Sequence, residues 1–294
     1  MYAITGATGN IGKLIAEGLL AKGKKVKVIG RSAERLQPLV DKGAEAFVGS
    51  VEDAAAMTRA FTGVKAVFSM IPPNFSAENL RAYQNKVGEA LATAIKNAGV
   101  QYVVNLSSMG AHLSEKVGPI NGLRDQEQRL NQLEGVNVLH LRPCFFMENL
   151  TRNMDLIKQM GLNGGPLKPD LAIPMIATRD IAAVATELLV NLNFSGKSAR
   201  ELLGPRDISM AEVTQIIGKA IGKEDLKYVQ FPYEEVERAM VGMGLSPDVA
   251  RSFIELNRGF NEGILVPTEP RSAANTTPTS FEEFVQVLVS IYSK

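Results

Sequence analysis

The first twelve residues constrain the fold of this chain more than any other segment. A short apolar strand, Tyr2–Thr5, runs into a segment with the apolar periodicity of a helix, Asn10–Lys22. Three glycines spaced three apart stand at this junction: Gly6, Gly9 and Gly12. Such glycines permit a sharp turn, close approach of an anion to the backbone, and tight packing of the helix on the strand.

This junction predicts a phosphate site. The first amides of a helix have no intrahelical partner, and the helix dipole favours an anion beside them. We therefore expect the pyrophosphate of a dinucleotide to bind at the start of the segment Asn10–Lys22. A glycine-rich turn that holds no ligand is the alternative.

The end of the second predicted strand indicates which dinucleotide binds. This strand, Lys25–Ile29, is followed by Gly30, Arg31 and Ser32. An NAD site usually places an acid about 20 residues past the glycines, where it accepts hydrogen bonds from the ribose hydroxyls. A guanidinium cannot accept such bonds but suits a phosphate, and Ser32 adds a hydroxyl donor. The sequence predicts NADP(H) rather than NAD(H), unless Arg31 is an ordinary surface arginine.

Strand and helix patterns alternate through the first half of the chain. The predicted strands are Tyr2–Thr5, Lys25–Ile29, Ala44–Val48, Ala66–Met70, Tyr102–Leu106 and Val138–Leu141. The predicted helices are Asn10–Lys22, Ala33–Lys42, Asp53–Phe61, Ala77–Asn97 and Gly122–Leu133. This alternation predicts an α/β fold of the Rossmann type, with a doubly wound parallel sheet. Ligands in such sheets bind beyond the carboxyl ends of the strands.

The second half of the chain has a different pattern. Its helical stretches, separated by loops that contain Gly and Pro, are Asn149–Met160, Arg179–Asn191, Met210–Ile221, Tyr233–Gly242 and Phe281–Tyr292, and Glu269–Thr279 is predicted to be a loop. We interpret residues 1–145 as an NADP(H)-binding Rossmann domain. Residues 146–294 are interpreted mostly as a smaller C-terminal α/β lobe that covers the substrate, with some elements returning to the first domain.

Composition argues against several classes of function. The net charge of +1 indicates no direct binding of nucleic acid and no attraction to an anionic membrane. No apolar run approaches the roughly 20 residues that span a bilayer. Two histidines and a single cysteine form no metal-ligand cluster of recognisable spacing, so no metal is predicted.

The same features bear on the cellular compartment and on partners. A single cysteine, Cys144, excludes an intrachain disulfide and suits a reducing compartment. The glycine motif begins so early that no room is left for a signal peptide ahead of it. We expect a cytoplasmic protein, a monomer or a homodimer, that acts on a small molecule.

Four segments together resemble a known family. They are Thr5–Gly12, Gly30–Ser32, Asn105–Ser108 and Arg142–Asn149, the last being the most specific. The sequence resembles the NmrA-like branch of the atypical short-chain dehydrogenases/reductases, close to the NADPH:quinone oxidoreductases. The resemblance covers most of the chain and is strongest before residue 150. It implies a Rossmann domain with a small C-terminal lobe and a cleft between them. The family includes reductases as well as proteins that sense NADP(H) without clear turnover.

The resemblance also implies site residues, most of them at strand ends. Those expected to bind the cofactor are Gly6, Thr8, Gly9, Asn10, Ile11, Gly12, Arg31, Ser32, Ser69, Met70, Ile71, Ser107 and Pro143. Phe145 and Phe146 would lie near the nicotinamide and contact the substrate. Core packing is the alternative for both phenylalanines.

The sequence departs from the short-chain dehydrogenase pattern in its catalytic pair. These enzymes use Tyr-x-x-x-Lys, in which the tyrosine passes a proton to the substrate oxygen. The matching segment, Pro119–Gln128, contains neither a tyrosine nor a lysine. A quinone is electron-poor and accepts hydride with little acid assistance, whereas a ketone or aldehyde depends on it.

The departure leaves three hypotheses. The preferred one is an NADP(H)-dependent oxidoreductase that passes hydride to a quinone-like acceptor. The second is an NADP(H)-binding redox-sensing regulator without turnover. The third is a reductase of a specialised aromatic or enone substrate, similar to the isoflavone reductase group, which generally keeps a lysine that this chain lacks.

A few other polar residues could act in catalysis. His112, a few residues past the serine pair, is the candidate proton donor, because its ordinary pKa suits transfer near neutrality. A surface role for His112 is the alternative. His140, within a strand pattern, and Cys144 are expected to be structural. Arg124, Asp125 and Glu127 lie on a polar helical pattern and are expected to be solvated.

Overall fold

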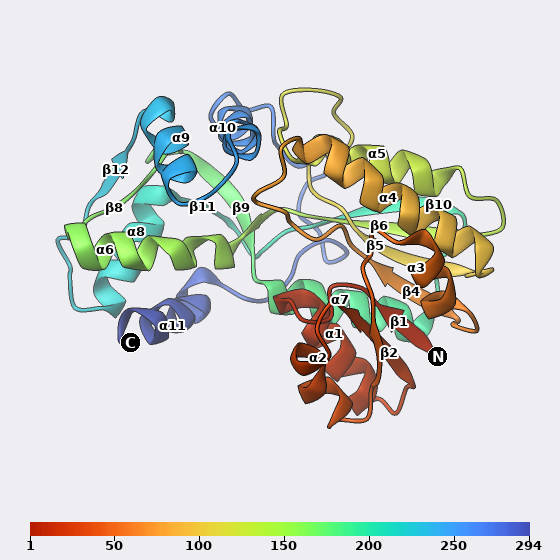
Figure 1. Cartoon of the computed structure of the whole chain (residues 1–294). Helices are drawn as coiled ribbons and strands as arrows, with labels where there is room; N and C mark the ends of the chain where they lie inside the picture. Colours follow the sequence, from red (N-terminus) through yellow and green to blue (C-terminus); the bar gives the residue numbers. More distant parts are fainter.

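The computed structural model describes all residues, 1–294, and its centre is a seven-stranded parallel sheet (Figure 1). In spatial order its strands are β10 (Lys197–Leu202), β6 (Asn137–Pro143), β5 (Tyr102–Leu106), β4 (Ala66–Ser69), β1 (Tyr2–Ile4), β2 (Val26–Gly30) and β3 (Glu45–Val48). Chain order reverses between β1 and β4, and such a switch point is where nucleotides bind in doubly wound sheets. The predicted Rossmann-type α/β fold is confirmed.

Helices cover both faces of this sheet (Figure 1). One face carries α1 (Asn10–Ala21), α2 (Ala33–Val40) and α7 (Thr178–Asn191), and the other carries α3 (Ala54–Phe61), α4 (Leu80–Asn97) and α5 (Ile120–Asn131). Neighbouring strand residues alternate between the two cores: Val103 packs with α3 and α4, and Val104 with α1 and α7. Both cores are dry, which explains why these strands are nearly continuous apolar runs.

The second half of the chain adds a lobe beside the sheet, at the left of Figure 1. Its strands are β7 (Phe145–Phe146), β8 (Asn163–Gly165), β9 (Ala172–Ile176), β11 (Asp207–Ser209) and β12 (Tyr228–Gln230), which form a sheet β11-β9-β7 and a pair β12-β8. Its helices are the 3-10 helix η1 (Met147–Arg152) and the α-helices α6 (Asn153–Met160), α8 (Met210–Ala220), α9 (Tyr233–Gly242), α10 (Pro247–Asn261) and α11 (Phe281–Tyr292). None of the helices combines the length and apolarity that crossing a bilayer requires.

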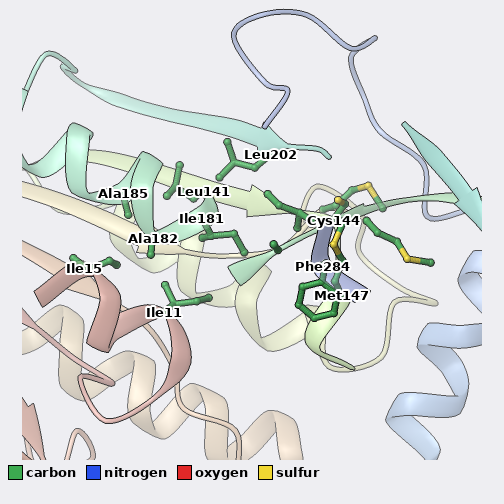
Figure 2. Close-up of a cluster of buried hydrophobic side chains, with 14 of the residues drawn as sticks. Ile11, Ile15, Leu141, Cys144, Met147, Ile181, Ala182, Ala185, Leu202 and Phe284 are labelled. Carbon is green, nitrogen blue, oxygen red and sulfur yellow. The ribbon is translucent and has the colours of Figure 1, made fainter. Parts of the chain in front are cut away.

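A continuous apolar cluster joins the lobe to the sheet. In Figure 2, Ile11 and Ile15 of α1 lie opposite Ile181 and Ala182 of α7. The same cluster continues through Cys144, Met147 and Phe284, the last on α11. α7 and β10 therefore belong to the second half of the sequence but pack into the first sheet.

Two carboxylates fix the start of α7 and the loop that leads to α11. Glu148 accepts hydrogen bonds from the backbone N–H of Thr178 at 2.9 Å and from its hydroxyl at 2.6 Å, and so caps the helix. Asp180 is buried and accepts from the hydroxyl of Thr279 at 2.7 Å. The segment Glu269–Thr279 is irregular, as predicted, but these bonds hold its end against the sheet domain.

The predicted first-half strands and helices agree with the structure, mostly to within two residues, whereas parts of the second half were missed. Helix α10 and the short strands β7 to β12 were not predicted. The signal for α10 is present: Ser246 accepts from the N–H of Val249 at 3.2 Å, and Pro247 takes the first helical position. A serine cap followed by proline at the first helical position is a local signal for a helix start.

Candidate functional site

The turn between β1 and α1 needs two of its three glycines for steric reasons. Gly6 has φ +64°, and a Cβ there would lie 2.3 Å from the sulfur of Met70. A Cβ on Gly12 would lie 2.3 Å from the carbonyl oxygen of Gly6. A Cβ on Gly9 would meet only that same oxygen, at the ordinary contact distance of 3.4 Å. Gly6 and Gly12 therefore shape the turn, and Gly9 keeps the helix start accessible.

The first amides of α1 are free. Gly9 is the N-cap of the helix, and no side chain caps it. The first backbone bond of the helix runs from the N–H of Lys13 to the oxygen of Gly9, so the N–H groups of Asn10, Ile11 and Gly12 have no backbone acceptor. Free donors at the positive end of a helix dipole are the arrangement that favours an anion.

The end of β2 lies beside this turn and carries an unpaired cation. A Cβ on Gly30 would be 3.4 Å from a methyl carbon of Thr8, so the two loops are in contact. Arg31 is exposed, and no carboxylate lies within ion-pair distance of it. The hydroxyl of Ser32 accepts from the N–H of Arg35 at 3.3 Å and caps α2. No acid stands where an NAD site would place one.

The end of β4 is tied directly to the glycine turn. The hydroxyl of Thr5 donates to the oxygen of Phe68 at 3.1 Å and accepts from the N–H of Met70 at 2.9 Å. This bridge sets Met70 against Gly6. Ser69 and Ile71, on either side of Met70, are both buried, and the hydroxyl of Ser69 has no partner.

The ends of β5 and β6 bring two further predicted residues together. The N–H of Ser107 donates to the oxygen of Leu141 at 2.7 Å, and that of Met109 donates to the oxygen of Pro143 at 3.0 Å. The hydroxyl of Ser107 is buried beside Glu127, without a well-formed hydrogen bond. A buried hydroxyl that lacks such a bond is costly, so such an atom at a strand end is a candidate contact for a ligand.

Below these ends lies a buried ion pair. Arg142 donates to Glu127 through Nε at 2.9 Å and through Nη2 at 2.5 Å. Burial alone would raise the pKa of Glu127, but the hydrogen bonds from Arg142, together with nearby charges and the Ser107 hydroxyl, hold the pKa below its usual value. The expectation that Glu127 is solvated is wrong: this face of α5 packs on the sheet, and the buried partner is Arg142.

Asp125, on the same helix, is also paired rather than solvated, since Arg81 donates to it through two nitrogens at 2.8 and 2.9 Å.

His140 is structural, as expected. Its ring accepts from the amide of Asn105 at 3.1 Å and donates to Asn131 at 3.0 Å. Burial lowers the pKa of His140 to about 4, so the ring is neutral near pH 7. Burial also raises the pKa of Cys144 to about 12, and the thiol is inert.

Helix α10 holds the loops that follow β4 and β5. Ser246, its N-cap, donates its N–H to the oxygen of Phe75 at 2.9 Å and its hydroxyl to the oxygen of Ala77 at 2.6 Å. Asp248 accepts from the N–H of Leu80 at 2.8 Å. On the other side, a Cβ on Gly118 would lie 1.9 Å from the oxygen of Ser252, so the loop after β5 is packed against α10 as well.

Aromatic side chains connect α10 to the predicted substrate residues. Phe145 and Phe146 are half-buried, and the ring of Phe145 meets that of Phe260 edge-on at 6.2 Å. The ring of Phe75 lies 6.3 Å from that of Phe253. Phe75, Phe253 and Phe260 were not among the predicted residues, because α10 was not recognised.

The predicted proton donor lies apart from these contacts. His112 is exposed in the loop after β5 and makes no hydrogen bond. No group of three His, Cys, Asp or Glu side chains is placed to hold a metal ion. A separate open groove of about 710 Å³ lies between α1, α7 and residues 273–277, and it contains none of the predicted site residues.

The chain is similar in sequence to known reductases. The chain is 29% identical to an NAD(P)H azoreductase of Xenophilus azovorans over 87% of its own length and 86% of the relative. It is 28% identical, over 91% of each protein, to a (4-alkanoyl-5-oxo-2,5-dihydrofuran-3-yl)methyl phosphate reductase of Streptomyces griseus.

The fold matches a crystal structure of an NADPH-dependent quinone oxidoreductase of Escherichia coli in complex with NADPH. The TM-score is 0.76, with 23% identity, 98% of this chain covered and 100% of the other. The model of the NmrA-like family matches residues 2–285, which is nearly the whole chain. The chain therefore belongs to the NmrA-like family.

Proposed function

We propose that this protein is an NADP(H)-dependent oxidoreductase that passes a hydride to a quinone-like acceptor. The observation that carries the proposal is that two groups suited to phosphate lie at the carboxyl ends of the neighbouring strands β1 and β2. The free amides of Asn10, Ile11 and Gly12 suit a pyrophosphate, and the unpaired guanidinium of Arg31 suits a 2′-phosphate.

The remaining strand ends fit the rest of the dinucleotide. Ser69, Met70 and Ile71 would border the adenine and its ribose. The buried hydroxyl of Ser107 makes no well-formed hydrogen bond within the chain and would bind the nicotinamide half beside Pro143. Bound NADPH supplies the hydride, and the quinone takes up that hydride and one proton to become a hydroquinone. The aromatic surface around Phe145 would exclude water and hold the acceptor flat.

The choice of acceptor rests on what α5 lacks. Its sequence, Ile120–Asn131, has no tyrosine or lysine to act as proton donor and to hold the ribose. A quinone tolerates that lack better than an aldehyde, because its anion takes a proton from water. His112 stays a candidate donor only if substrate binding brings it inward, since it is exposed. The same lack favours a second candidate function, an NADP(H)-sensing regulator without turnover.

The relatives support an acceptor of conjugated type. Azo compounds, quinones and the unsaturated lactone phosphate named for the Streptomyces relative are all electron-poor conjugated systems. The test is oxidation of NADPH, followed by its absorbance, with quinones, enones, azo dyes and aldehydes. We expect turnover of quinones and none of aldehydes. NADPH binding by calorimetry, with no turnover of any acceptor, would favour the regulator instead.

A further inference from the structure

One face of α10 carries two phenylalanines that form a row with two others. Phe253 and Phe260 are seven residues apart, which is two helical turns, so they lie on the same face. Phe253 contacts Phe75, and Phe260 contacts Phe145. We name Phe75, Phe253, Phe260 and Phe145 the aromatic row. Phe260 is buried in the core, whereas Phe75, Phe253 and Phe145 are half-buried, so these three rings form the part of the row that a flat ligand can contact.

A cation stands at the Phe75 end of the aromatic row. The guanidinium carbon of Arg152 lies 5.0 Å from the centre of the Phe75 ring. Arg152 is the last residue of η1, which follows β7 directly, so the chain that carries Phe145 also carries this arginine. Arg152 and Phe145 therefore lie on one segment, opposite the segment of α10 that completes the row.

The cation of Arg152 is available to a ligand. The side chain is exposed, and no carboxylate lies within ion-pair distance of its nitrogens. Glu148, on the same short helix, is engaged by Thr178, and the exposed Asp155 makes no ion pair with Arg152. A second arginine, Arg258, also stacks on an aromatic ring, with its guanidinium carbon 4.1 Å from the centre of the Tyr233 ring. Unlike Arg152, it forms an ion pair, with Glu234 at 3.9 Å.

The backbone at Phe75 and at Ala77 is tied to α10, and the Phe75 ring packs on Phe253. The oxygen of Phe75 accepts from the N–H of Ser246, and the neighbouring Ala77 is bound by the Ser246 hydroxyl. Stacking on the face of a ring leaves the N–H edges of the guanidinium free to donate two parallel hydrogen bonds. Carboxylate, sulfonate and phosphate groups accept such a pair.

We propose that Arg152 is a specificity-determining residue that binds an anionic group on a flat conjugated acceptor lying along the aromatic row. The inference rests on the proposed function, since it takes the row to be the acceptor site. Preferred substrates are then quinone-like compounds that carry a carboxylate, sulfonate or phosphate at one end.

The test compares a naphthoquinone sulfonate with the unsubstituted naphthoquinone, for the wild type and for Arg152→Gln. We expect the substitution to raise the KM for the sulfonate about tenfold, because one charge-assisted contact is lost. The kcat for the sulfonate should stay nearly unchanged. The KM for the neutral quinone stays within about twofold. Arg258→Gln, the ring-stacked arginine that has an acidic partner, is the matched control and leaves both KM values unchanged. Equal effects of Arg152→Gln on the two quinones, or no effect, would overturn the inference.

A binding measurement separates this inference from the proposed function. Naphthalene sulfonate cannot be reduced, and its affinity for the protein with NADP⁺ present is measured by calorimetry. About tenfold weaker binding to Arg152→Gln than to the wild type supports the Arg152 site even if no quinone is turned over. Equal affinities, or no binding to the wild type, overturn it. Absence of turnover with binding intact would instead contradict the oxidoreductase proposal alone.

Discussion

Arg142 and Glu127 form a two-bonded ion pair that joins β6 to α5 beneath the candidate cofactor site. The two side chains are only 16% and 6% exposed, and the shorter bond is 2.5 Å. This buried pair fixes α5 to the sheet. α5 is also the helix that carries no Tyr-x-x-x-Lys. The ion pair therefore ties α5 to the end of β6, where Pro143 lies.

Glu127→Gln should destabilise the protein by about 3 kcal/mol, because it leaves the Arg142 guanidinium buried without its counter-charge. The measurement is urea unfolding at neutral pH. Arg81→Gln is the control: it breaks an ion pair to the same helix, but the Arg81 side chain is 53% exposed, so the loss should stay below about 1 kcal/mol. Equal losses for the two variants would show that burial does not set the strength of the Arg142 pair.

His140 should make stability depend on pH in the acid range. Its pKa is about 4 in the folded protein, against an ordinary value of 6.5, because burial disfavours the charged ring. Between these values the unfolded chain binds a proton that the folded protein does not bind. The free energy of unfolding therefore falls as pH decreases from about 6.5 toward 4, by about 3 kcal/mol at most.

Urea unfolding between pH 7 and pH 5 measures this slope. His140→Gln should show a shallower fall than the wild type, whatever its stability at pH 7. His112→Gln removes the only other histidine, which is exposed, and should keep the wild-type slope. If the slope of the wild type survives in His140→Gln, other groups carry the pH dependence.

Two glycine substitutions should separate folding from cofactor binding. Gly12→Ala places a methyl 2.3 Å from the oxygen of Gly6 and should lower the melting temperature as well as NADPH affinity. Gly9→Ala makes only a 3.4 Å contact, so the fold should persist while the methyl obstructs approach of the phosphates. Thermal melts and NADPH calorimetry give both readouts. Unchanged NADPH affinity in Gly9→Ala would place the pyrophosphate elsewhere.

Arg31→Ala should weaken NADPH binding about tenfold or more and leave NADH binding nearly unchanged, because only NADPH carries the 2′-phosphate. Calorimetric titration of both dinucleotides checks this. Lys25→Ala is the matched control. It also removes an exposed positive charge, but Lys25 precedes β2 and so lies at the amino-terminal end of the strand, opposite the end that carries Arg31. A parallel loss of affinity for both dinucleotides would mean that Arg31 does not contact the 2′-phosphate.

Several parts of the candidate site could be predicted because their signals are local. The glycine spacing encodes a turn whose steric demands involve only Gly6, Gly12 and the adjacent Met70. The strand ends at Arg31 and Ser107 follow from apolar runs that stop at polar residues. Local patterns of this kind need no knowledge of the partner across the sheet.

The errors share a different cause. Glu127 looks solvated in a polar helical pattern, and only the packing of α5 on β6 brings it to Arg142. Helix α10 was missed although Ser246 and Pro247 mark its start, and with it the contacts of Phe253 and Phe260. The contacts of Phe253 and Phe260 join residues more than one hundred positions apart. The Glu127–Arg142 pair spans only 15 positions, but it joins a helix to a strand, so only the packing of the two elements brings the side chains together.

The sequence by itself determined the Rossmann-type alternation, the glycine turn and the lack of tyrosine and lysine in α5, because each is written in a short segment with a fixed period, spacing or composition. The tertiary structure alone decided which charges are buried, how the loops after β4 and β5 are held by α10, and that Arg152 stands at the end of the aromatic row. The physical reason is that burial and side-chain pairing depend on contacts between distant segments, and only the folded chain sets those contacts.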